Sequence, residues 1–212
     1  MRGQELRVVL RGAFERLAET KDELRDLDSA VGDGDLGITV SAGAAAAIEA
    51  TRNLPEDATP HAVVVACAAA FASANPSTFA ALAAAGMLSG AEKILGLVEI
   101  DREDIIRFGR AAAEAIARRG KSALGDKTML DALVPSIDAL EAGFSDDGRA
   151  LEAAIAAARA GIDQTSGQVS RRGRAAWAGE RGIGAPDAGA TAYLRFIEAL
   201  RTESQSEKWK TA

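Results

Sequence analysis

The stretch ATPHAVVVACAAAFASANPSTFAALAAAGMLSGA, residues 58–91, contains no Asp, Glu, Lys or Arg. It is long enough to span a bilayer. However, the polar segment SANPST interrupts it, and many of its apolar positions are alanine, the strongest helix former. Neither end carries the Trp or Tyr that marks a membrane interface. The stretch therefore predicts two buried helices of a globular protein, one on each side of Pro76, rather than a membrane span.

The same helical pattern extends over the rest of the chain. Near the start, Leu6, Leu10, Phe14 and Leu17 recur at helical spacing and share one face. No run alternates apolar and polar residues as a half-buried strand does. The pattern predicts eight helices, at residues 4–26, 37–52, 60–74, 77–96, 102–119, 128–142, 147–168 and 188–203. Eight helices on short connections predict an all-α fold, a closed barrel or bundle of antiparallel helices, within a single domain of residues 1–212.

Composition argues against two kinds of partner. The formal net charge is −6 and the pI is near 5.0, without a long Lys/Arg block, which argues against a nucleic-acid-binding surface. Cys67 is the only cysteine, so an internal disulfide is excluded, as is typical of a reducing compartment. The first residues, MRGQELRVVLRGAFERL, lack the apolar core of a signal peptide. We therefore expect a cytoplasmic protein with neither a nucleic-acid nor a membrane partner.

Three aspartates, Asp28, Asp33 and Asp35, gather on the glycine-rich stretch DSAVGDGDLG. Two carboxylates ~4 Å apart repel by roughly 4 kcal/mol near a protein surface, so they either splay into water or surround a cation. Carboxylates without His or Cys favour a hard cation such as Mg²⁺ or Ca²⁺. An EF-hand is excluded, because Ala44 stands where its bidentate Glu belongs. The simpler alternative is an Asp-Gly turn in which Asp35 caps the next helix.

A second connection, GKSALGDKTMLD at residues 120–131, is richer in glycine and charge than a simple turn needs. A helix start would explain it equally well. In that interpretation Asp126 caps the helix and Met129 belongs to the core.

A third connection, GRAAWAGERGIGAPDAGA at residues 173–190, is long for a compact helical chain. Arg174 and Arg181 stand near glycines that allow close backbone approach, as a loop covering a phosphate requires. The alternative is a surface loop with solvated arginines.

In this order and spacing, the three motifs resemble the L subunit of dihydroxyacetone kinase, the nucleotide-binding component of that enzyme. The resemblance covers nearly the whole chain. It implies a barrel of eight antiparallel helices with ATP or ADP held at one end by two Mg²⁺ ions.

The resemblance also implies roles for individual residues. Asp28, Asp33 and Asp35 match the metal ligands, and Arg174 matches a phosphate contact that would also act in catalysis. The other nucleotide contacts that it implies are the backbone turn of Leu36, Gly37, Ile38 and Thr39, the nucleoside contacts Gly120 and Met129, and the closing segment Asp187, Ala188 and Gly189.

The chain departs from the family pattern on one side of this site. Leu36 and Thr39 stand where the family usually has His and Asn. NPSTF, residues 75–79, stands where the family has a glycine-rich loop. Ser77 and Thr78 could still offer hydroxyl and amide groups to a phosphate at a helix start.

The sequence therefore predicts a kinase subunit that passes phosphate from Mg-bound ATP, or from ADP rephosphorylated in place, to a small hydroxyketone or sugar. In the family, a separate K-type subunit holds the sugar through a histidine, so we expect such a partner. A phosphocarrier of the phosphotransferase system is the other candidate phosphate donor. The alternative function, favoured by Leu36 and NPSTF, is a nucleotide-loaded regulatory or binding module without phosphotransfer.

Overall fold

The computed structural model describes residues 1–143 and 147–205. In these ranges the chain forms nine α-helices and two 3₁₀ segments, and its extended pairing is limited to one isolated bridge between Arg2 and Glu99. In chain order the elements are α1 (Gly3–Glu19), α2 (Lys21–Val31), α3 (Leu36–Arg52), α4 (Pro60–Ala74), α5 (Thr78–Ala91), η1 (Glu92–Ile94), α6 (Arg102–Gly120), α7 (Leu130–Glu141), α8 (Asp147–Ser166), η2 (Arg174–Gly182) and α9 (Ala188–Gln205). Within the described ranges, no helix is long and apolar enough to cross a membrane.

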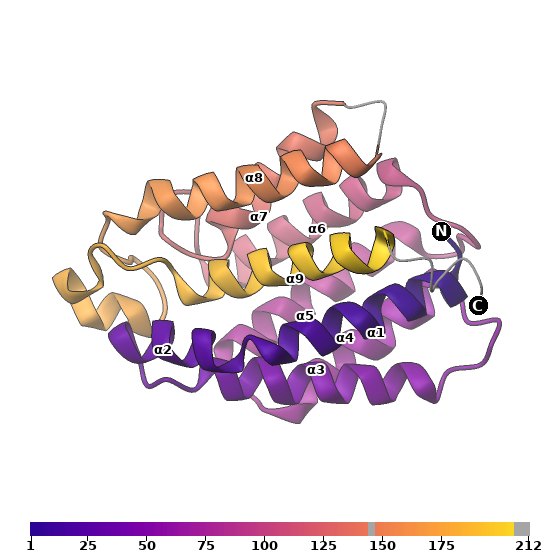
Figure 1. Ribbon diagram of the computed structural model, residues 1–212, viewed down its shortest axis with the longest axis horizontal. Coiled ribbons are helices and arrows are strands. Elements are labelled where there is room, and N and C mark those ends of the chain that lie inside the picture. The colour runs from indigo at the N-terminus through magenta and orange to yellow at the C-terminus, as the bar shows by residue number, and fades with distance from the viewer. Residues whose placement is uncertain (144–146, 206–212) are drawn as a thin grey trace.

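The helices close into a barrel. From α3 to α9, each α-helix packs against the next, α1 packs against α3, and α9 returns to pack against α1 (Figure 1). Helix α2 continues beyond α1 on the same side of the ring. Counted as one position, α1 and α2 together with the seven helices α3 to α9 make eight positions around the ring. The predicted all-α barrel of antiparallel helices is confirmed.

The single helix predicted over residues 4–26 is wrong, because the chain forms α1 and α2 there, separated at Thr20. The Thr20 hydroxyl donates to the carbonyl of Leu17 at 2.7 Å. Such side-chain bonds to the preceding turn compete with the helical ladder and bend helices. Helix α2 then runs to Val31, so Asp28 lies in a helix and not in the glycine-rich turn that follows it.

Two further boundaries differ from the prediction. The helix predicted over 77–96 ends at Ala91, and η1 follows it before the chain turns at Gly96, whose φ is +81°. The irregular connection predicted over 173–190 carries the 3₁₀ segment η2.

Small side chains let the helices approach closely. A Cβ on Gly161 of α8 would collide with the backbone carbonyl of Asp131 on α7. Val40, Val63 and Cys67 are fully buried in the core. Burial raises the pKa of the Cys67 thiol to about 12.

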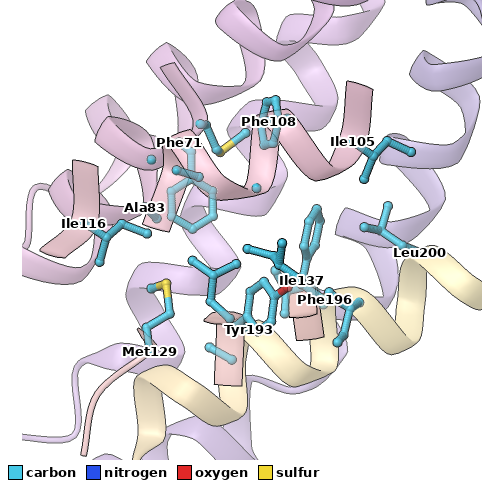
Figure 2. Close-up of a pocket in the computed structure, with 18 of the residues that line it drawn as sticks. Phe71, Ala83, Ile105, Phe108, Ile116, Met129, Ile137, Tyr193, Phe196 and Leu200 are labelled. Carbon is cyan, nitrogen blue, oxygen red and sulfur yellow. The ribbon is translucent and has the colours of Figure 1, made fainter. Parts of the chain in front are cut away.

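The centre of the barrel contains an apolar cavity of about 250 Å³ (Figure 2). Its lining includes Phe71 from α4, Phe108 from α6 and Phe196 from α9. The hydroxyl of Tyr193 and Oγ of Ser136 form a hydrogen bond of 2.7 Å, which satisfies both groups beside this apolar space. Burial raises the pKa of Tyr193 to about 12.

The up-and-down order of the helices brings alternate connections to the same end of the barrel. The α2–α3, α4–α5, α6–α7 and α8–α9 connections therefore share one end, where the ribbon of η2 lies beside α2 (Figure 1). All three charged, glycine-rich motifs belong to these connections.

Candidate functional site

Asp28, Asp33 and Asp35 converge where α2 ends and α3 begins. One carboxylate oxygen from each residue lies within 4.8 Å of the other two. Asp28 lies on the last turn of α2, and the other two lie on the connection to α3. Gly34 between them has a φ of +75°, a conformation that favours glycine and lets the chain fold back. We call these three residues the aspartate cluster.

The alternative in which the side chain of Asp35 caps the next helix is wrong. Asp35 occupies the N-cap position of α3, but its carboxylate accepts no cap hydrogen bond. The amide of Leu36 instead donates to Oδ2 of Asp28 at 3.2 Å. Asp28 thus connects the end of α2 to the start of α3, while Asp33 and Asp35 keep their oxygens for another partner.

That partner is the guanidinium of Arg174, the first residue of η2. One guanidinium nitrogen bonds Asp33 and also Oδ2 of Asp35 at 3.0 Å, and the other bonds Oδ1 of Asp35 at 2.6 Å. The hydrogen bond to Asp35 raises the pKa of Arg174 further above its already high ordinary value. Two of the three carboxylates of the aspartate cluster therefore bind a cation, the guanidinium of Arg174.

The first turn of α3 presents its backbone to this end of the barrel. The side chains of Leu36 and Thr39 are buried, whereas Ile38 is 54% exposed. Gly37 is required by packing, because a Cβ there would collide with the backbone of α2. The side-chain amide of Asn75 donates to the Thr39 hydroxyl at 3.1 Å, which ties the α4–α5 connection to α3.

The start of α5 lies beside the start of α9. Ser77 caps α5, since its hydroxyl accepts a hydrogen bond from the amide of Ala80 at 3.1 Å, and Thr78 is the first helical residue. A Cβ on Gly189 would lie 3.6 Å from the ring of Phe79. Residues 77–78, which could offer groups to a phosphate, and the expected closing segment 187–189 are thus neighbours.

Asp126 does not have the capping role that the alternative interpretation assigned to it. The N-cap residue of α7 is Met129, and it makes no side-chain cap bond. The carboxylate of Asp126 accepts the amide of Ala123 at 3.0 Å and Nε of Arg172 at 2.9 Å. These bonds lower the pKa of Asp126, with the hydrogen bond from Arg172 as the largest cause.

Gly120 and Met129, the two predicted nucleoside contacts, have different surroundings. Gly120 ends α6, and a Cβ there would lie only 3.1 Å from the hydroxyl oxygen of Ser122. The side chain of Met129 lines the barrel cavity (Figure 2). The core role that the alternative interpretation gave to Met129 is therefore observed, and the nucleoside contact stays a prediction.

Lys127 is a buried residue of the 120–131 motif whose burial the sequence pattern does not predict. Lys127 is 2% exposed, and its ammonium donates to the carbonyls of Ser166, Gln168 and Gly182 at 2.9, 3.0 and 2.7 Å. Burial lowers the pKa of Lys127, partly opposed by the charge of Asp187. A lysine in a glycine-bearing loop gives no local signal that it is buried, so only the structure reveals this role.

Asp187 lies between the aspartate cluster and the 120–131 connection. It caps α9, with Oδ2 accepting the amide of Ala190 at 2.7 Å. Burial is the main cause that raises the pKa of Asp187 to about 6, and the charges of Asp131 and Asp28 add to it. The carboxylate charge of Asp187 therefore disfavours the folded state at neutral pH.

Asp187→Asn should be more stable than the parent at pH 7.5, because Asn keeps an oxygen for the cap and removes the charge. The folded parent holds the Asp187 proton up to about pH 6, whereas the unfolded chain loses it near pH 4, so parental stability falls as the pH rises between these values. We expect a gain of roughly 1–3 kcal/mol at pH 7.5 that disappears below about pH 4. Thermal unfolding without nucleotide, compared at pH 4 and 7.5, measures it; a variant less stable at both pH values would contradict this account.

Comparison with known proteins identifies similar chains. The family described as the DAK2 domain matches residues 30–202. The L-erythrulose 1-kinase of Mycolicibacterium smegmatis is 34% identical over 86% of this chain, and the match covers 32% of that protein. The PEP-dependent dihydroxyacetone kinase 1, ADP-binding subunit DhaL, of Listeria innocua is also 34% identical, over 89% of this chain and 91% of its own length. This chain thus spans about a third of one relative and nearly the whole of the other.

One similar solved structure is the dihydroxyacetone kinase from C. freundii in complex with AMP-PNP and Mg²⁺. It superposes with a TM-score of 0.73 at 22% identity, over 92% of this chain and 33% of that chain. At this identity, the similarity is one of fold.

Proposed function

Because the chain belongs to the DAK2 domain family, we propose that it is the nucleotide-binding subunit or domain of a kinase of the dihydroxyacetone kinase type. In this proposal residues 1–212 act as one domain, with the nucleotide at the end of the barrel that holds the aspartate cluster. The observation that carries the proposal is the convergence of three carboxylates at that end, two of which bind the guanidinium of Arg174. Relatives of this chain are kinases and kinase subunits by name, which supports the same assignment.

The residues present fit magnesium. Asp28, Asp33 and Asp35 would hold it, two ions by analogy with the family, because hard carboxylate oxygens suit Mg²⁺. When bound, the metal neutralises phosphate charge, which phosphoryl transfer requires more than covalent help from the protein.

Arg174 is proposed as the residue that stabilises the transferred phosphoryl group. Its side chain and that of Asp35 are each 39% exposed, and exposed ion pairs contribute only about 0–1 kcal/mol. The guanidinium can therefore exchange carboxylate for phosphate oxygens at small cost. Its planar donors suit bidentate contact with phosphate.

The remaining nucleotide contacts are proposed from position. The first turn of α3 offers backbone donors at a helix N-terminus, where anions bind. Ser77 and Thr78, at the start of α5, would act in the same way. The other proposed contacts are Gly120 and Met129 at the nucleoside and the segment Asp187–Gly189 as the closing edge.

The acceptor is proposed to be a small ketose presented by a K-type partner. His61, the only histidine of the chain, begins α4, whose other end faces the site, so it cannot reach the phosphates. Trp177 is 86% exposed on η2 beside the site, with Ile183 49% exposed nearby in the chain. Exposed aromatic residues of this kind anchor interfaces, so we propose η2 as part of the docking surface.

Two phosphate donors remain in the proposal. ATP could be exchanged at each turnover, or a phosphocarrier could rephosphorylate bound ADP. Assays with ATP alone and with a phosphocarrier system separate these donors.

Since Cys67 is the only cysteine and is buried, we also propose a cytoplasmic location.

A second candidate function is a nucleotide-loaded binding module that transfers no phosphate. The buried Leu36 favours it, because its side chain points into the core where the family usually has a polar residue. Phosphate transfer by a mixture with a K-type partner would exclude this candidate.

Magnesium and nucleotide should stabilise the chain only together. At Mg-ADP one hundredfold above its dissociation constant, the expected gain in unfolding free energy is about 2.7 kcal/mol. ADP with a chelator should have almost no effect, because the carboxylates repel the phosphates without metal between them. Thermal unfolding with Mg-ADP, ADP plus chelator, and Mg²⁺ alone tests the proposed function; equal stabilisation with chelator would contradict metal bridging.

A further inference from the structure

The segment that carries Arg174 leaves and re-enters the barrel at nearly the same point. We call residues 167–183 the arginine loop. At its base, the carbonyl of Ser166 accepts the amide of Gly184 at 2.9 Å. The loop is thus closed by its own backbone at a narrow neck, and Arg174 lies beyond that neck.

Lys127 lies inside the neck, although it belongs to a different connection of the barrel. Its ammonium reaches Ser166 and Gln168 on the outgoing side and Gly182 on the returning side. Its φ is +60°, a conformation uncommon for residues with a side chain. The buried side chain of Lys127 is therefore committed to this contact.

Asp126 adds a second tie between the same two connections. Its carboxylate bonds Nε of Arg172 at 2.9 Å, and its carbonyl accepts the amide of Arg171 at 3.1 Å. These bonds fix the chain two and three residues before Arg174.

From this geometry we propose that Lys127 is a positioning residue, which closes the neck of the arginine loop and thereby holds Arg174 over Asp33 and Asp35, with Asp126 as its second tie. The inference rests on the proposed function for the consequence of that placement. It assigns to Lys127 no contact with nucleotide.

The chemistry of the two ends of the loop explains why the neck decides the position of Arg174. An ammonium has three donors and no acceptor, so one lysine joins three carbonyls from both sides of the neck. The outer part of the loop contains Gly173 and Gly179, whose φ values are +65° and +56°, and the ion pairs of Arg174 there are exposed. Without Lys127, the backbone hydrogen bond from Gly184 to Ser166 would be left to hold the two sides of the neck together.

The first test uses Lys127→Met in the full chain without ligand. Hydrogen exchange of the amides in 174–182 should accelerate at least tenfold, while exchange in α4 and α6 stays unchanged. Lys93→Met is the matched control, because Lys93 is an exposed lysine in η1, beyond the far end of α5. Unchanged exchange in the loop of Lys127→Met would overturn the inference, whatever happens to nucleotide binding.

The second test is a double-mutant cycle on Mg-ADP affinity measured by calorimetry. Arg174→Gln and Lys127→Met should each weaken binding roughly 10- to 100-fold, the range of a hydrogen bond to a charged group. Together they should weaken it no more than about threefold beyond Arg174→Gln alone, because Lys127 acts through Arg174. Multiplied losses in the double variant would show an independent structural effect and would overturn the inference.

The two proposals fail in different ways. Full affinity in Arg174→Gln would contradict the proposed phosphate role of Arg174, and the exchange experiment would still decide whether Lys127 holds the loop. If Lys127→Met loses helical content by circular dichroism, Arg172→Gln replaces it in both tests, because it cuts only the tie to Asp126 at a side chain that is 47% exposed. Its exchange and affinity changes should be about two- to fivefold, with the affinity loss again absent in the Arg174→Gln background.

Discussion

Asp33→Asn should weaken Mg-ADP binding by at least roughly a hundredfold while leaving helical content unchanged. Mutation of a group that only orients a metal ligand typically costs 10- to 100-fold in affinity, so loss of a ligand should cost at least as much. The side chain of Asp33 is 54% exposed and its ion pair with Arg174 is at the surface, so the substitution should change stability little. Calorimetry with Mg-ADP and circular dichroism give the two readouts.

Asp22→Asn is a suitable control for this variant. Asp22 lies on α2, the helix that carries Asp28, and its side chain is 78% exposed and paired with Arg25. The control removes the same charge from the same region without touching the aspartate cluster, so it should retain nearly full affinity. Nucleotide affinity unaltered in Asp33→Asn would reduce the cluster to an acidic turn neutralised by Arg174.

The chain alone should phosphorylate free three- and four-carbon ketoses at least roughly a thousandfold more slowly than the mixture with a K-type partner. Transfer requires an acceptor held in line with the phosphate, and such positioning supplies effective concentrations of 10⁵ M or more in favourable cases. It also requires a base within hydrogen-bond reach of the acceptor hydroxyl. The carboxylates of the aspartate cluster are assigned to metal, and His61 is at the wrong end of α4. Steady-state turnover with Mg-ATP, before and after addition of the partner, measures the difference.

Trp177→Ala extends this experiment to the proposed docking surface. If η2 forms part of that surface, the variant should bind Mg-ADP normally and need about tenfold or more partner for half-maximal turnover. Val98→Ala is the matched control, since Val98 is 78% exposed and follows η1, outside the site connections. Robust turnover by the parent chain without any K-type partner would contradict the preceding prediction and would show that a sugar site lies within the chain.

The sequence by itself determined the helical class, most helix positions and the aspartate cluster. Helical periodicity and alanine content are local properties, so they could be read without knowing what each helix packs against. Three aspartates within eight residues that include two glycines can fold back on one another, which is why Asp28, Asp33 and Asp35 could be singled out. The order of the three motifs along the chain also identified the family before any geometry was known.

The tertiary structure alone decided which charged residues meet. Arg174 lies 139 residues from Asp35 in the chain, and Lys127 lies 55 residues from Gly182, so no local pattern could pair them. The inward side chain of Met129 likewise depends on how the helices close into a ring. Burial is set by contacts between segments distant in sequence, whereas periodicity reports only on neighbours along one helix. For this reason the role of Lys127 in closing the arginine loop could be recognised only in the folded chain.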